Sequence, residues 1–117
     1  MTKSIAFTVY PVTDLNRAIG FYRDVVGLGE ATLLNERWAE FNVNGSTFAV
    51  ATGGEQIGMP PGSGFSIGFE VDNVDEAVQK VRDRGLEAGD PFEAHGCHAS
   101  FAHDPDGNRF ALHKLKK

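Results

Sequence analysis

Three side chains able to bind a metal or act as nucleophiles fall close together near the end of the chain. His95 and Cys97 are two residues apart, so in a strand they project from the same face. If the segments flanking residues 104–108 pair as a hairpin, Cys97 lies diagonal to His113. Zinc accepts imidazole and thiolate ligands, so an alternative metal site at these three residues stays open. We favour the structural alternative of a loop histidine, a small buried cysteine and a pocket histidine.

Hydrophobic patterns indicate the elements that must position such residues. Segments 5–12 and 64–71 alternate as strands do, and Asp14 and Asn73 follow them where helix N-caps belong. Apolar residues then recur at helical spacing, which predicts a helix after each cap. These residues are Leu15, Ala18, Ile19, Tyr22, Val25 and Val26 in the first helix, and Val74, Ala77, Val78 and Val81 in the second.

Three short strands are predicted after each helix. Asn44 and Gly45 tolerate positive φ and indicate a hairpin turn. Residues 104–108, Asp-Pro-Asp-Gly-Asn, also predict a turn, because proline presets its backbone and glycine supplies a left-handed residue. They lack the spaced acidic ligands and closing glutamate of a calcium loop. The predicted strands are 29–34, 38–43 and 47–52 in the first half, and 86–88, 95–103 and 109–114 in the second.

The two halves resemble each other at an offset of 59 residues, with apolar residues falling on apolar residues. We therefore predict one α+β domain over residues 1–117, made of two βαβββ modules. Module one covers 1–55 and module two covers 64–117. A linker rich in glycine and proline joins them at about 53–63.

Two motifs accompany this order of elements. They comprise Tyr10, Val12, Asp14, Leu15, Ala18, Phe21, Tyr22, Gly27 and Leu28, and later Phe101, Asp104, Pro105, Asp106, Gly107, Asn108 and Leu112. With these motifs, the order resembles the glyoxalase/bleomycin-resistance/dioxygenase, or vicinal oxygen chelate, superfamily. The resemblance implies a curved, cup-like mixed sheet with helices outside, a cavity inside, and in many members a homodimer, often with cavities shared between chains. The enzymes of the family hold a divalent metal with histidine and glutamate from four strands.

The family's metal positions do not carry metal ligands in this chain. The resemblance places them at Phe7, Ser66 and Ala111, and on the fourth strand at Val50 or Thr52. Phenylalanine, alanine and valine cannot coordinate a metal, and a lone hydroxyl is a poor ligand for it. The family's metal-dependent activities are therefore not carried over, and no cofactor is expected.

Strand parity predicts which side chains line the cavity. Aromatic walls with a few carboxylates suit a small planar or cationic molecule. The alternative is that the aromatic rings only fill the space of a lost metal site, and Glu70 equally fits a surface position at a strand end. The predicted ligand-binding residues are Phe7, Val9, Trp38, Glu40, Phe48, Ser66, Glu70, Phe101 and His113.

The sequence favours a metal-independent small-molecule-binding protein similar to the bleomycin-resistance branch. The alternatives are a metal-dependent lyase, isomerase or dioxygenase with non-standard ligands, which leaves enzymatic activity open, and a dimer scaffold for interactions. A net charge of −5 disfavours nucleic acid as a partner. The chain has no apolar run of about 20 residues for a membrane. With a single cysteine and no signal peptide, the cytoplasm is the predicted location.

Overall fold

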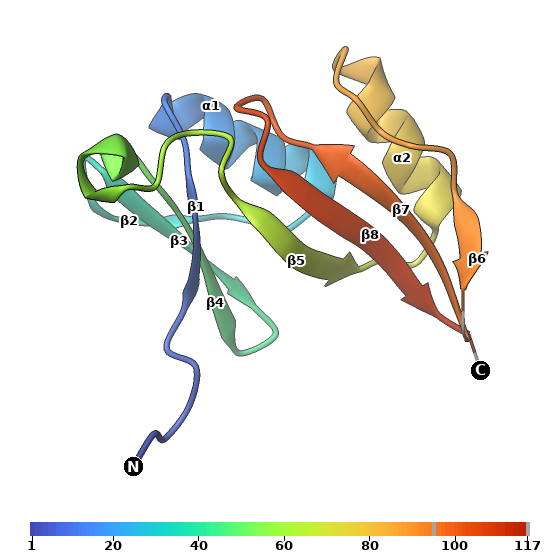
Figure 1. Ribbon diagram of the computed structural model, residues 1–117, viewed down its shortest axis with the longest axis horizontal. Coiled ribbons are helices and arrows are strands. Elements are labelled where there is room, and N and C mark those ends of the chain that lie inside the picture. The colour runs from blue at the N-terminus through green and yellow to red at the C-terminus, as the bar shows by residue number, and fades with distance from the viewer. Residues whose placement is uncertain (95, 117) are drawn as a thin grey trace.

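The computed structural model describes residues 1–94 and 96–116. Strand, helix and three strands follow one another twice (Figure 1). The first half comprises β1 (Thr8–Pro11), α1 (Leu15–Gly20), the π-helical η1 (Phe21–Val26), β2 (Thr32–Asn35), β3 (Trp38–Val43) and β4 (Ser46–Ala51). A 3-10 helix, η2 (Gly54–Ile57), precedes the second half, which comprises β5 (Phe65–Glu70), α2 (Val74–Asp83), β6 (Phe92–Ala94), β7 (Cys97–His103) and β8 (Arg109–Leu115).

The strands form two four-stranded sheets. Sheet A has the order β1-β4-β3-β2 and sheet B the order β5-β8-β7-β6. In each sheet the first pair is parallel and the other two pairs are antiparallel. The predicted α+β class with two βαβββ halves is therefore confirmed, although the eight strands form two sheets and not one hydrogen-bonded sheet.

Both predicted helix starts are confirmed. The Asp14 side chain accepts a hydrogen bond from the Arg17 N–H, and the Asn73 side chain accepts one from the Glu76 N–H, each at 3.0 Å. These bonds satisfy N–H groups that have no partner inside the helix. No helix of the described residues is long and apolar enough to cross a membrane.

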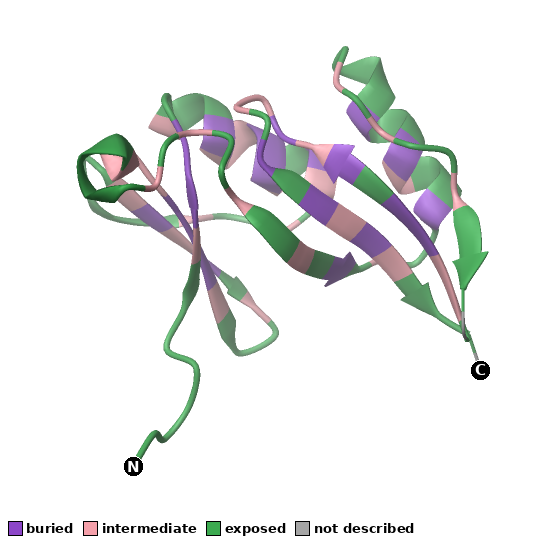
Figure 2. Cartoon of the chain, in the orientation of Figure 1, coloured by how far each residue is buried: buried purple, intermediate pink, exposed green. Residues whose placement is uncertain are grey.

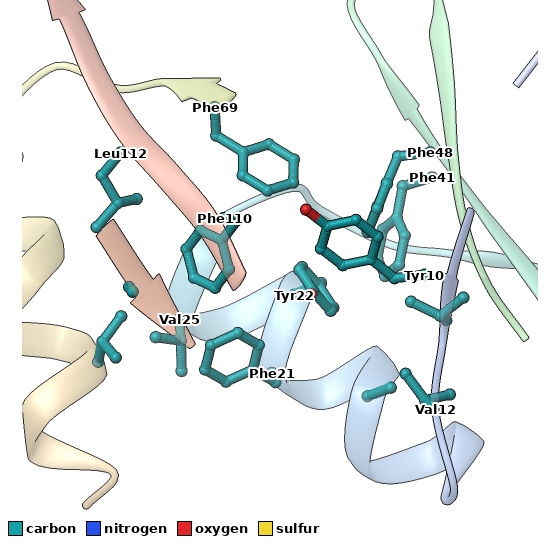
Figure 3. Packing of buried hydrophobic residues seen from close by; sticks show 14 of the residues in the cluster. Tyr10, Val12, Phe21, Tyr22, Val25, Phe41, Phe48, Phe69, Phe110 and Leu112 are labelled. Atoms are coloured by element: carbon teal, nitrogen blue, oxygen red, sulfur yellow. The ribbon is translucent and has the colours of Figure 1, made fainter. Parts of the chain in front are cut away.

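One hydrophobic core lies between the two sheets on their helix-facing sides. Tyr22 is fully buried, and its ring lies 4.9–6.3 Å from phenylalanine rings of both sheets (Figure 3). The π-helical turn at η1 allows the adjacent Phe21 and Tyr22 both to be buried. Burial alternates along β8, so one face of this strand packs on the core while the other is more open (Figure 2). The four phenylalanines of the two sheets around Tyr22 are Phe41, Phe48, Phe69 and Phe110.

The turn at residues 104–108 joins the two halves. Asp104 is buried and accepts hydrogen bonds from the Tyr22 hydroxyl and the Asn108 amide. Burial raises the pKa of the Asp104 carboxyl, against the opposing effect of these bonds. Asn108 also donates to the Pro11 carbonyl at 2.7 Å. The contacts agree with the turn role predicted for this segment.

The strands predicted at 5–12 and 29–34 are observed with other bounds, Thr8–Pro11 and Thr32–Asn35, and two further predicted features differ from the structure. Residues 86–88 form no strand, and only Ala88 makes an isolated bridge, to Ala102. The edge strand is β6, which begins after Pro91. Residues 53–63, predicted as a linker, contain η2, whose flanking glycines Gly53 and Gly58 have φ of 83° and 80°. The positive φ values at both ends make this a tight, defined turn of chain.

Candidate functional site

The faces of the two sheets that point away from the helices, the open faces, carry most of the predicted site residues. In sheet A, Glu40 pairs with Ala49, and Ala49 pairs with Val9, so all three share the open face. In sheet B, Phe101 pairs with Ala111 and Ala99 pairs with His113. Each open face is therefore built from alternate residues of its strands.

A hollow of about 410 Å³ lies at the open face of sheet A. One wall comes from the sheet and the other from the segment that contains η2. Gly54 permits the tight fold of this segment, because a Cβ there would lie 2.2 Å from the Met59 carbonyl oxygen and 3.1 Å from Pro11 Cβ of β1. The lining residues are Val9, Pro11, Asn35, Glu36, Arg37, Trp38, Ala51, Thr52, Gly53, Gly54, Ile57 and Met59.

Trp38 is the aromatic side chain of this hollow. Its indole Nε1 donates a hydrogen bond to a Glu40 carboxylate oxygen at 2.8 Å. Phe7 packs edge-on against the indole, with ring centroids 5.1 Å apart and an interplanar angle of 87°. The bond and the ring contact hold the indole in one orientation, which prepares it to stack on a planar ligand.

Sheet B has a smaller hollow, of about 200 Å³, on its open face. Phe101 forms one wall, and the Arg109 guanidinium carbon lies 4.1 Å from the centre of its ring. Phe92 stacks on Phe101, with centroids 5.9 Å apart. Phe65 completes the lining beside Ser66.

Glu70 and His113 form a hydrogen-bonded pair at the far end of sheet B. His113 Nδ1 lies 2.6 Å from one Glu70 carboxylate oxygen, and the other oxygen accepts the Leu115 N–H at 2.7 Å. The backbone hydrogen bond, followed by the His113 bond, lowers the pKa of the Glu70 carboxyl. The pair is a positioned acid–base couple with one imidazole nitrogen left for another partner.

The described residues do not fit a divalent metal centre. The open face of sheet B offers Ala111 and an exposed Ser66, and Phe7 precedes β1. Among residues 1–94 and 96–116, no three His, Cys, Asp or Glu side chains lie close enough to share an ion. The alternative metal site included His95, which lies outside the described residues.

The predicted position of Phe48 in the cavity is wrong. Phe48 is 3% exposed and pairs with Phe41 on the core side of sheet A, and Val50 is likewise buried on that side. The run Phe48-Ala49-Val50-Ala51 is apolar at every position, so its pattern does not distinguish the two faces. Small alanines occupy the open face, where they leave room for the hollow.

The other predicted site residues fall into two groups within the chain. Sheet A and the segment before it position the first group, and sheet B the second. The hollow lined by Trp38 and the hollow lined by Phe101 have no lining residue in common. The first group is Phe7, Val9, Trp38 and Glu40, and the second is Ser66, Glu70, Phe101 and His113.

Sequence reasoning missed several residues of these hollows. Ile57 and Met59 belong to a segment predicted only as a linker. The Gly and Pro content of this segment does not predict that it forms one wall of the hollow at sheet A. Arg109 lines the hollow of sheet B but was not among the predicted ligand-binding residues. Phe65 was missed because a register shift in β5, between Phe65 and Ile67, changes the face on which Phe65 lies.

Comparisons with known proteins agree with this arrangement. A family model described as the Glyoxalase/Bleomycin resistance protein/Dioxygenase superfamily matches residues 4–112. No curated protein sequence matches the chain.

Three solved structures illustrate the similarity in fold. The antibiotic-binding protein TnmS3 from Streptomyces sp. CB03234 is 24% identical, with 98% of each chain covered and a TM-score of 0.79. A glyoxalase/bleomycin resistance protein from the same organism is 26% identical over 95% of this chain and 100% of its own, with a TM-score of 0.71. The fosfomycin resistance protein FosX from Listeria monocytogenes is 19% identical over 97% and 94%, with a TM-score of 0.72.

Proposed function

The chain belongs to the glyoxalase/bleomycin resistance protein/dioxygenase superfamily, and we propose that it is a metal-independent binding protein for a small aromatic molecule. The observation that carries the proposal is the 410 Å³ hollow at the open face of sheet A, with an oriented Trp38 in its lining. A largely apolar hollow with a few placed polar groups is the usual composition of a small-molecule site.

The donor chemistry of the chain supports metal independence. Metal-dependent lyases, isomerases and dioxygenases of this family need histidine or carboxylate ligands, and Phe7, Ser66 and Ala111 stand at the corresponding positions. Glu70 and His113 supply two donor side chains, which is fewer than the three protein ligands of a catalytic zinc site. We therefore assign Glu70 and His113 to contact with the small-molecule ligand.

Structural neighbours agree with a role in binding small molecules. TnmS3 is an antibiotic-binding protein, and FosX is a fosfomycin resistance protein. At 24% and 19% identity these proteins share the fold with this chain, so they support the class of ligand and do not define it. We retain the cytoplasm as the predicted location.

We further propose that the chain acts as a homodimer with shared sites. Each sheet leaves an open face, and exposed rings on sheet B include Phe65, Phe92 and Phe101. A second chain that places its sheet B opposite sheet A of the first would enclose Trp38 together with these rings. Such an arrangement uses one interface twice, as expected for a two-fold symmetric dimer.

The first test uses Trp38, which is the only tryptophan of the chain. Small aromatic compounds are screened by quenching of its fluorescence, and affinities of the hits are then measured by calorimetry. Trp38→Leu is expected to weaken binding by about 1–3 kcal/mol, the range of a lost aromatic anchor. Leu34→Ala, at an exposed apolar residue of β2, is the matched control and should bind as wild type.

Two outcomes would contradict the proposal. Unchanged affinity in Trp38→Leu would remove this side chain from the site. A stoichiometric metal in protein purified without a tag and dialysed against zinc, nickel, manganese and iron would overturn metal independence. In that case the alternative of a metal-dependent enzyme with non-standard ligands would take its place.

A further inference from the structure

A row of aromatic and cationic side chains crosses the open face of sheet B from one edge to the other. Phe92 on β6 stacks on Phe101 of β7, and Phe101 lies under the guanidinium of Arg109 on β8. Arg109 pairs directly with Phe65 on β5. Four strands thus contribute one side chain each to a continuous band beside the 200 Å³ hollow.

Phe65 joins this band because of a bulge in β5. The register shifts between Phe65 and Ile67, so Ser66 is an extra residue in the strand. Ser66 has a φ of 118°, a conformation that side-chain-bearing residues seldom adopt. The shift leaves Ile67 opposite Phe110, whose ring is in the core, and brings Phe65 opposite Arg109. Bulges of this kind turn a side chain toward a functional site.

The charge of the hollow is set by Arg109. Its lining contains a single charged side chain, and the other residues are Phe65, Ser66, Ile67, Phe101, Phe110 and Ala111. Among the ion pairs of the described residues, none includes Arg109. The guanidinium stacks on a ring and keeps its N–H donors for another acceptor, and its planar fork matches a carboxylate.

From this arrangement we propose that the ligand is a planar aromatic acid, whose ring packs between Phe65 and Phe101 and whose anionic group pairs with Arg109. The inference rests on the proposed small-molecule function and assigns a negative charge to the ligand. The proposed ligand is anionic, whereas Glu40 and Glu70 suggested a cationic one. Both carboxylates already have partners within the chain: Glu40 bonds Trp38, and Glu70 bonds His113 and Leu115. The small side chain of Ala111 and the adjacent Gly68 leave a shallow floor between the walls.

Three naphthalene probes of the same shape test the charge preference. Binding of 2-naphthoate, 2-naphthylmethanol and 2-naphthylmethylamine to the full chain is measured by calorimetry at low ionic strength. The wild-type protein should bind the naphthoate at least about tenfold more tightly than the other two, as one charge-assisted hydrogen bond provides. Arg109→Gln should abolish this preference for the naphthoate, and Arg109→Lys should retain part of it.

Two control variants distinguish a specific effect of Arg109 from an effect of the net charge of the protein. Arg84→Gln removes the same charge from the exposed end of α2 and should keep the full preference for naphthoate. Phe65→Leu should weaken all three probes alike, because it removes ring contact and no charge. Circular dichroism verifies that every variant is folded.

Either of two results would overturn the inference. One is a wild-type protein that binds naphthoate no better than the amine, and the other is Arg109→Gln with an unchanged preference. If naphthoate fails while another compound quenches Trp38, the aromatic-acid assignment is wrong and the small-molecule function stands. If neither naphthoate nor any compound of the screen binds, both the assignment and the proposed function are wrong.

Discussion

Glu70 is held at the end of β5 through both oxygens of its carboxylate. One oxygen bonds His113 Nδ1 and the other bonds the Leu115 N–H. The parity of β5 and β8 was sufficient to predict that Glu70 and His113 share a face. The backbone bond to Leu115 was not predicted, because β8 continues one residue past its predicted end at residue 114.

This environment predicts a pH dependence of stability. Because the hydrogen bonds lower the folded-state pKa of Glu70 below its ordinary value of 4.5, the ionised carboxylate stabilises the fold at pH values above 4.5. That contribution is lost as the pH falls from 4.5 through the lowered folded-state pKa. Urea unfolding of wild type and Glu70→Gln should therefore differ at pH 7 and converge in this acid range.

The exposed Glu30 provides the control for loss of charge alone. Glu30→Gln should leave the pH profile of the wild type unchanged over the same range. A difference between wild type and Glu70→Gln that stays constant from pH 7 down to pH 3 would contradict the assigned hydrogen bonds.

At the scale of elements, short-range sequence signals predicted the helix starts and β3 well, but they did not predict the edge strand β6. Asp14 and Asn73 cap their helices, and β3 has the predicted bounds, because capping and alternation are short-range effects. The strand predicted at 86–88 failed because three residues, Leu86-Glu87-Ala88, are too short a pattern to specify a partner strand. The three residues of β6 are all exposed, so the sequence of this strand has no alternation of buried and exposed residues that would predict its pairing with β7.

Two glycines of the first helical segment predict opposite effects on substitution. Gly20 has helical dihedral angles, φ −60° and ψ −41°, and a Cβ there would meet only the Arg23 guanidinium, at 4.0 Å. Gly20→Ala should stabilise the protein by about 0.5–1 kcal/mol, because alanine loses less backbone entropy. Gly27 has a φ of 85°, so Gly27→Ala should destabilise it by about 1–2 kcal/mol.

Urea unfolding at one protein concentration measures both substitutions. Equal effects of the two alanines would contradict the helix boundary at Gly27. A destabilised Gly20→Ala would show that the turn between α1 and η1 does not have room for a methyl group.

For the whole molecule, shared sites in a homodimer predict complementation between two defective chains. If sheet A of one protomer faces sheet B of its partner, Trp38→Leu and Arg109→Gln damage opposite walls of one site. Mixed dimers would then contain one doubly damaged site and one intact site. Random mixing should restore about a quarter of the sites to wild-type affinity, by the symmetry of the dimer.

Co-expression of the two chains with different tags, followed by calorimetry with naphthoate, measures the intact fraction. Sedimentation first establishes whether the mass in solution is that of a dimer. A mixture without any site of wild-type affinity would mean that the walls of each site belong to the same chain. The resemblance to a family with shared cavities raised this possibility, but one chain's sequence does not specify its partner's position.

The hydrogen bonds between the two halves also have a consequence for the order in which the chain can fold during synthesis. The Tyr10 hydroxyl donates to the Arg109 carbonyl and accepts the Ile67 N–H, and Asn108 donates to Pro11. During synthesis, β1 therefore leaves the ribosome long before its last partners exist. Until the second half is made, the hydroxyls of Tyr10 and Tyr22 lack the partners that they have in the fold. A chain that ends before residue 108 would leave these groups without those partners, so the last strand completes the packing of the first.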